Sequence, residues 1–157
     1  MSDYIAILKQ SLKKKIDVLE ELAKLCDYQS ELIGAENFDY ERFDAYVADK
    51  DVCLENIEKL DEGFETLYQR VKDELDSNRS RYAEDIRDMQ ASITKITELG
   101  VSIEAKEQRN RQGIERVILE DRKKLREGKR SLSVARNYYQ NMNMSGMDTS
   151  MYMDKKK

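Results

Sequence analysis

The chain has 157 residues, of which 38% are charged and 39% are hydrophobic, and it contains no proline, no histidine and only six glycines. A chain so poor in turn-forming residues does not suit a β-rich or α/β fold. Without histidine it cannot build a Ser-His-Asp or Cys-His nucleophile, and its scattered glycines form no phosphate-binding loop. The net charge of -4 gives no general attraction to nucleic acid or to anionic membranes. We therefore expect an elongated all-α protein that is not an enzyme and that holds no cofactor and no metal.

The N-terminal stretch contains no long apolar run and carries Asp3, so it resembles neither a signal peptide nor a membrane span. We expect a cytoplasmic protein that does not span a membrane.

Residues 2–33 are predicted to form the first helix. Its apolar residues recur at alternating steps of three and four, which is a heptad pattern, and only Lys15 and Gln29 interrupt it. Gly34 supplies the C-terminal stop, and Asp39 supplies the N-cap of the next helix. The residues of this seam are Ile5, Leu8, Leu12, Leu19, Leu22, Cys26 and Ile33.

The second predicted helix covers residues 40–75 and repeats the pattern, with one interruption at Lys50. Two helices of nearly equal length, about 50 Å each, joined by a short loop predict an antiparallel hairpin. In such a hairpin Cys26 and Cys53 are offset by roughly 10 Å along the axis, so we expect two reduced, packed thiols and no disulfide. This seam comprises Phe43, Tyr46, Cys53, Ile57, Leu60, Phe64, Leu67 and Val71.

The third predicted helix covers residues 82–140, either unbroken or with a break at 104–113. As far as Ile103 its seam can pack against the hairpin, whereas residues 104–113 offer a single alanine as their only apolar side chain. Polar residues weaken the seam at Glu107, Asn110 and Asp121. An unbroken helix would be about 90 Å long and would overhang the hairpin. The overhanging stripe must fold back, dimerise or bind another protein. The stripe consists of Ile114, Val117, Ile118, Leu125, Leu132 and Tyr139.

The chain also contains two stretches of opposite charge. Residues 122–136 contain seven basic residues and one acidic residue, whereas residues 39–65 contain ten acidic residues and three basic ones. These stretches could attract each other, steer a partner or remain solvated. The tail at 141–157 holds five of the seven methionines without helical periodicity, and we expect it to be disordered.

The order and lengths of these parts carry a resemblance to a known family. The first helix has the form L-x3-L-x6-L-x2-L and closes in the loop from Gly34 to Asp39. A lysine lies within the apolar seam of the second helix, and the helical part ends in the VARNYY segment, residues 134–139. The chain resembles the FlgN-type flagellar export chaperones over most of residues 1–142. The other matching positions are Phe43, Lys50, Leu54, Ile57 and Leu60, followed by Asn110, Ile114 and Ile118.

This resemblance implies a cytoplasmic chaperone that binds the C-terminal helical region of hook-filament junction proteins, prevents their premature self-assembly and delivers them to the export gate. The implied gate contact is Tyr138 or Tyr139, and the implied state without client is a monomer or a weak homodimer. The implied client-binding residues are Ile114, Val117, Ile118, Leu125 and Leu132.

Three other interpretations remain open from the sequence. The long helices could serve only to oligomerise, as in a structural coiled-coil protein. The chain could instead be a FliT-type chaperone for the filament cap. The basic stretch could contact nucleic acid, although it has no interleaved aromatic residues to stack on bases. The expected architecture is an all-α fold with three long helices in an antiparallel coiled-coil hairpin or bundle, the third helix overhanging, in a domain spanning 1–140.

Overall fold

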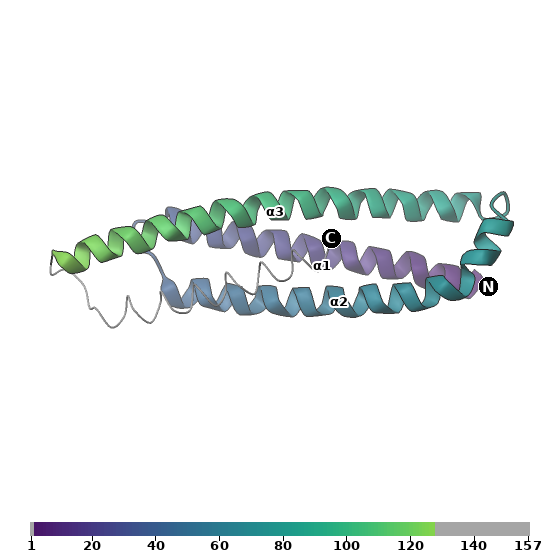
Figure 1. Cartoon of the computed structure of the whole chain (residues 1–157), viewed down its shortest axis with the longest axis horizontal. Helices are drawn as coiled ribbons and strands as arrows, with labels where there is room; N and C mark the ends of the chain where they lie inside the picture. The colour runs from purple at the N-terminus through teal and green to yellow at the C-terminus, as the bar shows by residue number, and fades with distance from the viewer. Residues whose placement is uncertain (1, 128–157) are drawn as a thin grey trace. The chain divides into compact units, whose positions relative to one another are not determined.

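The computed structural model describes residues 2–127, which form three α-helices (Figure 1). They are α1 (Ser2–Gly34), α2 (Tyr40–Ser77) and α3 (Ala83–Arg126). The predicted all-α fold is confirmed, and the described residues contain no strand. Helix α3 is continuous through 104–113, so the break considered there is absent. The rest of the predicted third helix, up to residue 140, and the tail at 141–157 lie outside the described residues.

Side-chain and backbone caps explain where the helices begin and end. The backbone N–H of Arg42 donates to Asp39 Oδ1 at 3.0 Å, which confirms Asp39 as the N-cap of α2. At the other end of α2, Asn78 Nδ2 donates to the backbone oxygen of Glu74 at 3.0 Å. The last turn of α3 carries three basic residues, which interact favourably with the negative end of the helix dipole.

The chain divides into two compact units, and each contains a piece of all three helices. Unit 1 consists of Met1–Lys24 and Val52–Glu104, and unit 2 consists of Leu25–Asp51 together with the chain from Ala105 onward. Within each unit the α2 segment runs antiparallel to the α1 segment, and the α3 segment runs parallel to it (Figure 1).

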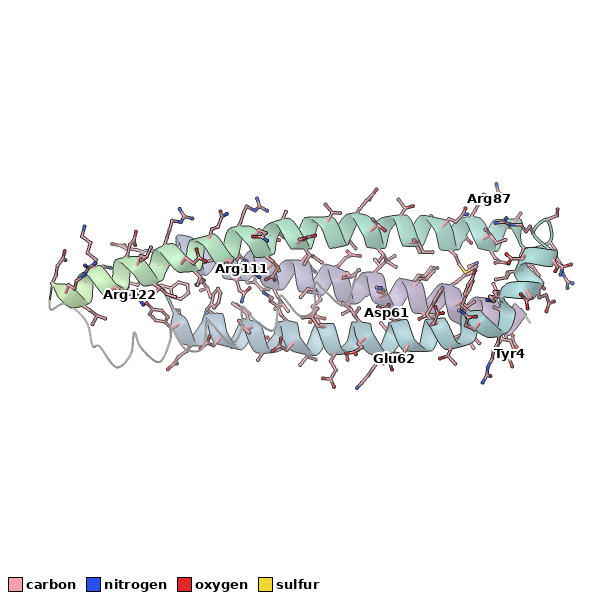
Figure 2. All side chains as sticks on the ribbon, viewed as in Figure 1. Tyr4, Asp61, Glu62, Arg87, Arg111 and Arg122 are labelled. Atoms are coloured by element: carbon pink, nitrogen blue, oxygen red, sulfur yellow. The ribbon has the colours of Figure 1, made fainter. Side chains whose placement is uncertain are left out.

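Unit 1 is built on the heptad seams that the sequence predicts. Its buried cluster draws on all three helices and on Tyr82, the residue directly before α3. Ion pairs flank the cluster. Lys9 Nζ lies 2.9 Å from Asp85 Oδ1 and 3.0 Å from Asp88 Oδ2. Lys15 Nζ lies 2.6 Å from Oδ1 of Asp61, which is labelled in Figure 2. Such partly exposed pairs contribute little to stability and mainly favour one alignment of the helices. The cluster comprises Ile5, Leu8, Leu12, Val71, Leu75, Tyr82 and Met89.

In unit 2 the α1 and α3 segments approach each other closely at Gly113. A Cβ placed on Gly113 would lie 2.7 Å from Ile33 Cγ2, too close for an undisturbed contact. Isoleucine is branched at Cβ, so this methyl group cannot easily rotate away. The glycine is therefore required by packing, whereas Gly100 has nothing within 4 Å of an added Cβ.

We expect Gly113→Ala to lower the free energy of unfolding by about 1–3 kcal/mol through overpacking, despite the better helix propensity of alanine. Gly100→Ala is the matched control and should raise it by about 0.5–1 kcal/mol. Urea denaturation of both variants measures the difference. Equal stabilisation by the two substitutions would show that α1 and α3 do not approach closely at Gly113.

Candidate partner-binding site

The apolar part of unit 2 is a small cluster at the end where α1 turns into α2. Phe43 of α2 and Ile114 and Ile118 of α3 are buried there, with exposed fractions of 8%, 2% and 6%. Phe38 of the connecting loop packs edge-on against Tyr40, with ring centroids 4.8 Å apart. We call this group the tip cluster; its half-buried members are Leu32, Ile33, Phe38, Tyr40 and Val47.

The tip cluster changes the interpretation of the apolar stripe on α3. The sequence suggested that packing against the hairpin ends near Ile103, but Ile114 and Ile118 are buried as well. The expectation of an uncovered stripe from Ile114 onward was wrong because the loop and the start of α2 supply aromatic side chains that cover these two residues. Phe38 and Tyr40 were missed in the sequence, although two aromatic residues next to a predicted N-cap are a recognisable signal of such packing.

The other predicted client-binding residues have different environments. Val117 and Leu125 are half-buried on α3, so part of each side chain is accessible to a partner. Leu132, Tyr138 and Tyr139 lie outside the described residues. The structure therefore brings Ile114 and Ile118 into one cluster and leaves Val117 and Leu125 at the accessible end of the same helix.

A second feature of unit 2 is a set of polar side chains in the middle of the three helices, which we call the polar layer. Lys50 Nζ forms an ion pair with Glu107 and donates to Gln29 Oε1 at 2.9 Å. The Cys26 thiol donates to Glu107 Oε1 at 3.0 Å, and Asn110 Nδ2 donates to the backbone oxygen of Cys26 at 2.9 Å. The layer thus consists of Cys26, Gln29, Lys50, Glu107 and Asn110 and connects α1, α2 and α3.

The polar layer accounts for at least one interruption in each of the three seams, but Lys15 of the first seam and Asp121 of the third lie outside it. Gln29 and Lys50 break the heptads of the first two helices, and Glu107 and Asn110 occupy seam positions of the third. Each of these four side chains takes part in a hydrogen bond or an ion pair inside the bundle. Buried polar groups destabilise a fold unless they are paired, so these residues act as a set that specifies one alignment of the helices.

The cysteines behave as the sequence predicts, because Cys26 and Cys53 are both buried and neither forms a disulfide. Burial raises the pKa of the Cys26 thiol to about 12, and the negative charge of Glu107 contributes to the same effect. The thiol therefore remains protonated at neutral pH and acts as a hydrogen-bond donor rather than as a nucleophile.

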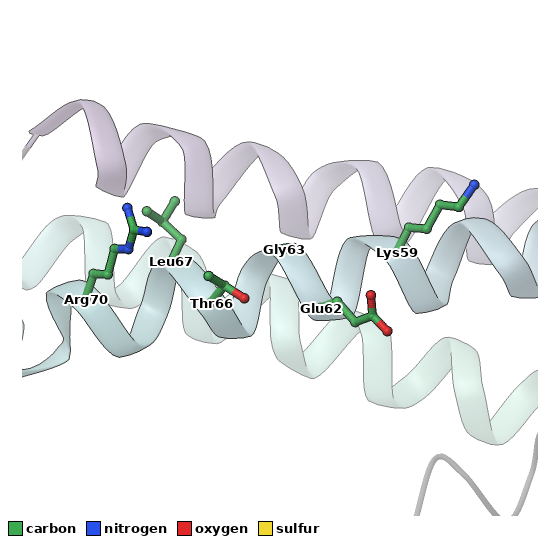
Figure 3. A pocket seen from close by; sticks show the side chains of 6 residues that line it. All are labelled: Lys59, Glu62, Gly63, Thr66, Leu67 and Arg70. Atoms are coloured by element: carbon green, nitrogen blue, oxygen red, sulfur yellow. The ribbon is translucent and has the colours of Figure 1, made fainter.

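The described residues do not assemble a metal-binding centre. They contain no group of three or more histidine, cysteine or carboxylate side chains that could hold a metal ion. A surface depression of about 450 Å³ in unit 1 is lined by α2 alone, and Figure 3 shows its side chains pointing in different directions around that helix. A ligand site requires convergent polar groups, so this depression does not qualify. Its lining residues are Lys59, Glu62, Gly63, Thr66, Leu67 and Arg70.

The surface of unit 2 carries opposite charges on two of its helices. The α2 segment bears Glu41, Asp44, Asp49 and Asp51, whereas the end of α3 bears four basic residues, among them Arg122 (Figure 2). Helix α3 also carries Arg111 earlier in the same unit (Figure 2). A partner that contacts both helices therefore meets an acidic side and a basic side.

These features define a helical-bundle protein with buried apolar seams and oppositely charged helix faces. The FlgN protein family model matches residues 1–146, and the chain belongs to this family. It is accordingly a flagellar export chaperone, a class of protein that binds flagellar proteins. Neither the search of curated proteins nor the search of solved structures found a match. In the part of the chain that the structure describes, no helix combines the length and apolar character that a membrane crossing demands.

Proposed function

We propose that this chaperone acts in the cytoplasm, binds the C-terminal helical region of hook-filament junction proteins, prevents their self-assembly and delivers them to the export gate. The observation that supports the proposal is the continuation of the α3 seam beyond the tip cluster. Leu125 follows Ile118 and the buried Asp121 at helical spacing but is only half-buried, so part of the α3 seam is accessible at this end of the helix. An amphipathic client helix can pack on such a continuation and thereby cover its own apolar face.

The proposed client surface consists of an accessible part and a buried part. A client helix would first contact Val117 and Leu125, which are half-buried, and Leu132, which continues the same spacing. Ile114 and Ile118 would join the contact only if the tip cluster opened. We further propose that Tyr138 or Tyr139, which follow this stripe in the sequence, contacts the export gate.

The test is binding of the full chain to the hook-filament junction proteins of the same genome, measured by calorimetry and by size exclusion with light scattering. We expect a one-to-one complex, and we expect Leu125→Asp to raise the Kd at least about tenfold, because burial of a leucine contributes about 1.5–3 kcal/mol. Leu119→Asp is the matched control, since Leu119 lies on α3 with 60% of its surface exposed. That variant should bind like the wild type.

Two results would contradict the proposal. One is a stable homodimer that does not bind the junction proteins, which would favour an oligomerising coiled-coil protein. The other is equal weakening by Leu125→Asp and Leu119→Asp, which would show that the seam of α3 is not the surface that the client contacts.

A further inference from the structure

In unit 1 the apolar seam of α3 has one closed column and one open column. Met89 and Ile103 of the closed column are 7% and 4% exposed. The open column begins at Ile86, which packs on the buried cluster of unit 1, and continues seven residues further with Ile93, which is 47% exposed. Seven residues after that, Gly100 is half-buried but has nothing within 4 Å of an added Cβ. Helix α3 therefore lacks a neighbour along the second column.

Helix α2 is the neighbour that the open column lacks. Val71 of α2 and Ile86 of α3 belong to the same cluster, which aligns the two antiparallel segments at this level. Counting back seven residues along α2 and forward seven along α3 from this pair places Phe64 opposite Ile93. Phe64 is itself only half-buried, so neither residue is covered by the other. Another step of seven gives the next pair, and we call both pairs together the open seam: Ile57, Phe64, Ile93 and Gly100.

A lysine of α1 lies at the same level. Lys15 interrupts the heptad seam of α1, and its Nζ lies 2.6 Å from Oδ1 of Asp61, one turn before Phe64 on α2. The side chain of Asp61 is 48% exposed, so the ammonium group of Lys15 reaches a carboxylate at the solvent edge of the open seam. A lysine can occupy a seam position in this way because its apolar stem remains inside while its charge stays near water.

The edge of the open seam is acidic. Glu58, Asp61 and Glu65 follow one another at steps of three and four along α2, and all three are exposed. On α3, Glu104 lies one turn after the open seam and adds a further carboxylate. Lys15 offsets only one of these four negative charges. The complement of this surface is therefore an apolar stripe with basic flanks.

We propose that the open seam is a docking surface for an amphipathic helix of another protein, whose apolar stripe is flanked by lysine or arginine. Such a helix would pack beside α2 and α3 as a fourth helix of unit 1, with its apolar stripe covering Phe64 and Ile93. Its basic flank would face the acidic edge of α2. The stretch from Ile57 to Val71 is about 21 Å long, which corresponds to a partner segment of about four helical turns.

The charge of the edge favours a different protein over a second copy of this chain. A symmetric contact between two open seams would bring two acidic edges together, which is electrostatically unfavourable. The inference does not depend on the proposed function, because the client surface proposed above begins at Ile114 and belongs to unit 2.

The test is binding of a designed three-heptad helical peptide to the full-length chain, measured by calorimetry. The basic peptide carries leucine at heptad positions a and d and lysine at e and g, so that charge repulsion opposes its self-association. The acidic peptide is identical except for glutamate at e and g. We expect the basic peptide to bind with a Kd at least about tenfold lower than that of the acidic peptide.

Two pairs of variants locate the basic peptide on the chain. Ile93→Asp should raise its Kd at least about tenfold, because a carboxylate would face the apolar stripe. Ile7→Asp on α1 is the matched control, since Ile7 is 53% exposed and lies outside the seam. Gly100→Leu should weaken binding by a similar factor, because the new side chain occupies the opening. Its control is Gly63→Leu on α2, where an added Cβ also has nothing within 4 Å.

The glycine variants also test whether the seam is open in the free chain. Both Gly100→Leu and Gly63→Leu should leave the Tm unchanged or raise it, because leucine is a better helix former than glycine. A fall in Tm for Gly100→Leu alone would show that α2 already closes the seam, and the proposal would be lost.

Three binding results would also overturn it. The first is no preference for the basic peptide. The second is equal weakening by Ile93→Asp and Ile7→Asp. The third is a homodimer of the free chain that Ile93→Asp dissociates, since this would assign the open seam to a second copy. Leu125→Asp, which tests the client surface, should leave the Kd of the basic peptide unchanged, so failure of either proposal is seen separately.

Discussion

Replacing Glu107 with leucine should lower the free energy of unfolding by about 3–5 kcal/mol, because the substitution leaves a buried lysine without its counter-charge. Lys50 and Glu107 have side chains that are only 9% and 11% exposed, so water cannot take over the role of the lost carboxylate. The Cys26 thiol also loses its acceptor. Chemical denaturation monitored by circular dichroism measures the effect.

The double variant Lys50→Met with Glu107→Leu distinguishes the loss of pairing from the loss of volume. It should recover most of the stability, because two apolar side chains pack in the interior without a desolvation penalty. Glu55→Ala serves as the surface control, since Glu55 and Lys59 form an exposed ion pair 3.8 Å long, and it should change stability by less than about 0.5 kcal/mol. A single Glu107→Leu variant as stable as the wild type would mean that Lys50 is accessible to water.

The second large effect is expected for Ile118→Asp, which introduces a carboxylate at a position that is 6% exposed in the tip cluster. We expect a loss of at least about 4 kcal/mol, since the substitution combines a lost apolar side chain with a buried charge. Hydrogen exchange should show the loss of protection first in residues 25–51 and 105–127, which make up the described part of unit 2. Unchanged protection there would show that Ile118 lies on an open surface.

Leu119→Asp, one residue further along α3, is the comparison for this experiment as well. Leu119 is 60% exposed, and the same change of chemistry should leave exchange protection close to that of the wild type. The difference between two neighbouring positions separates burial in the tip cluster from a general effect of aspartate on helix propensity.

Much of the helical layout could be predicted because it depends on local signals. The heptad spacing predicted the buried seam of α1, Gly34 predicted the end of α1, and Asp39 predicted the N-cap of α2. The structure confirms each of these. These signals act within one or two helical turns, so they can be recognised in a single segment.

What could not be predicted depends on contacts between distant segments. Glu107 and Asn110 looked like weak points in the third seam, because nothing near them in the sequence indicates that Lys50 and the Cys26 carbonyl lie opposite. From the sequence, Gly113 was expected only to lower the helix propensity of this segment. The structure shows that a glycine is needed there because Ile33 of α1 leaves no room for a Cβ. The family resemblance identified the kind of protein, but it could not show that Ile114 and Ile118 are already covered by the tip cluster.

The polar layer also has a consequence for the order of events during synthesis. The partners of Cys26 on α3 are 81 and 84 residues further along the chain, whereas the partner of Gln29 on α2 is only 21 residues away. As the chain emerges from the ribosome, α1 and α2 can pair long before Glu107 exists. Until then the charge of Lys50 is not neutralised by Glu107 of α3, so its ammonium group must stay in contact with water in the nascent hairpin. This half of the bundle can therefore first close only after the segment around Glu107 has emerged from the ribosome.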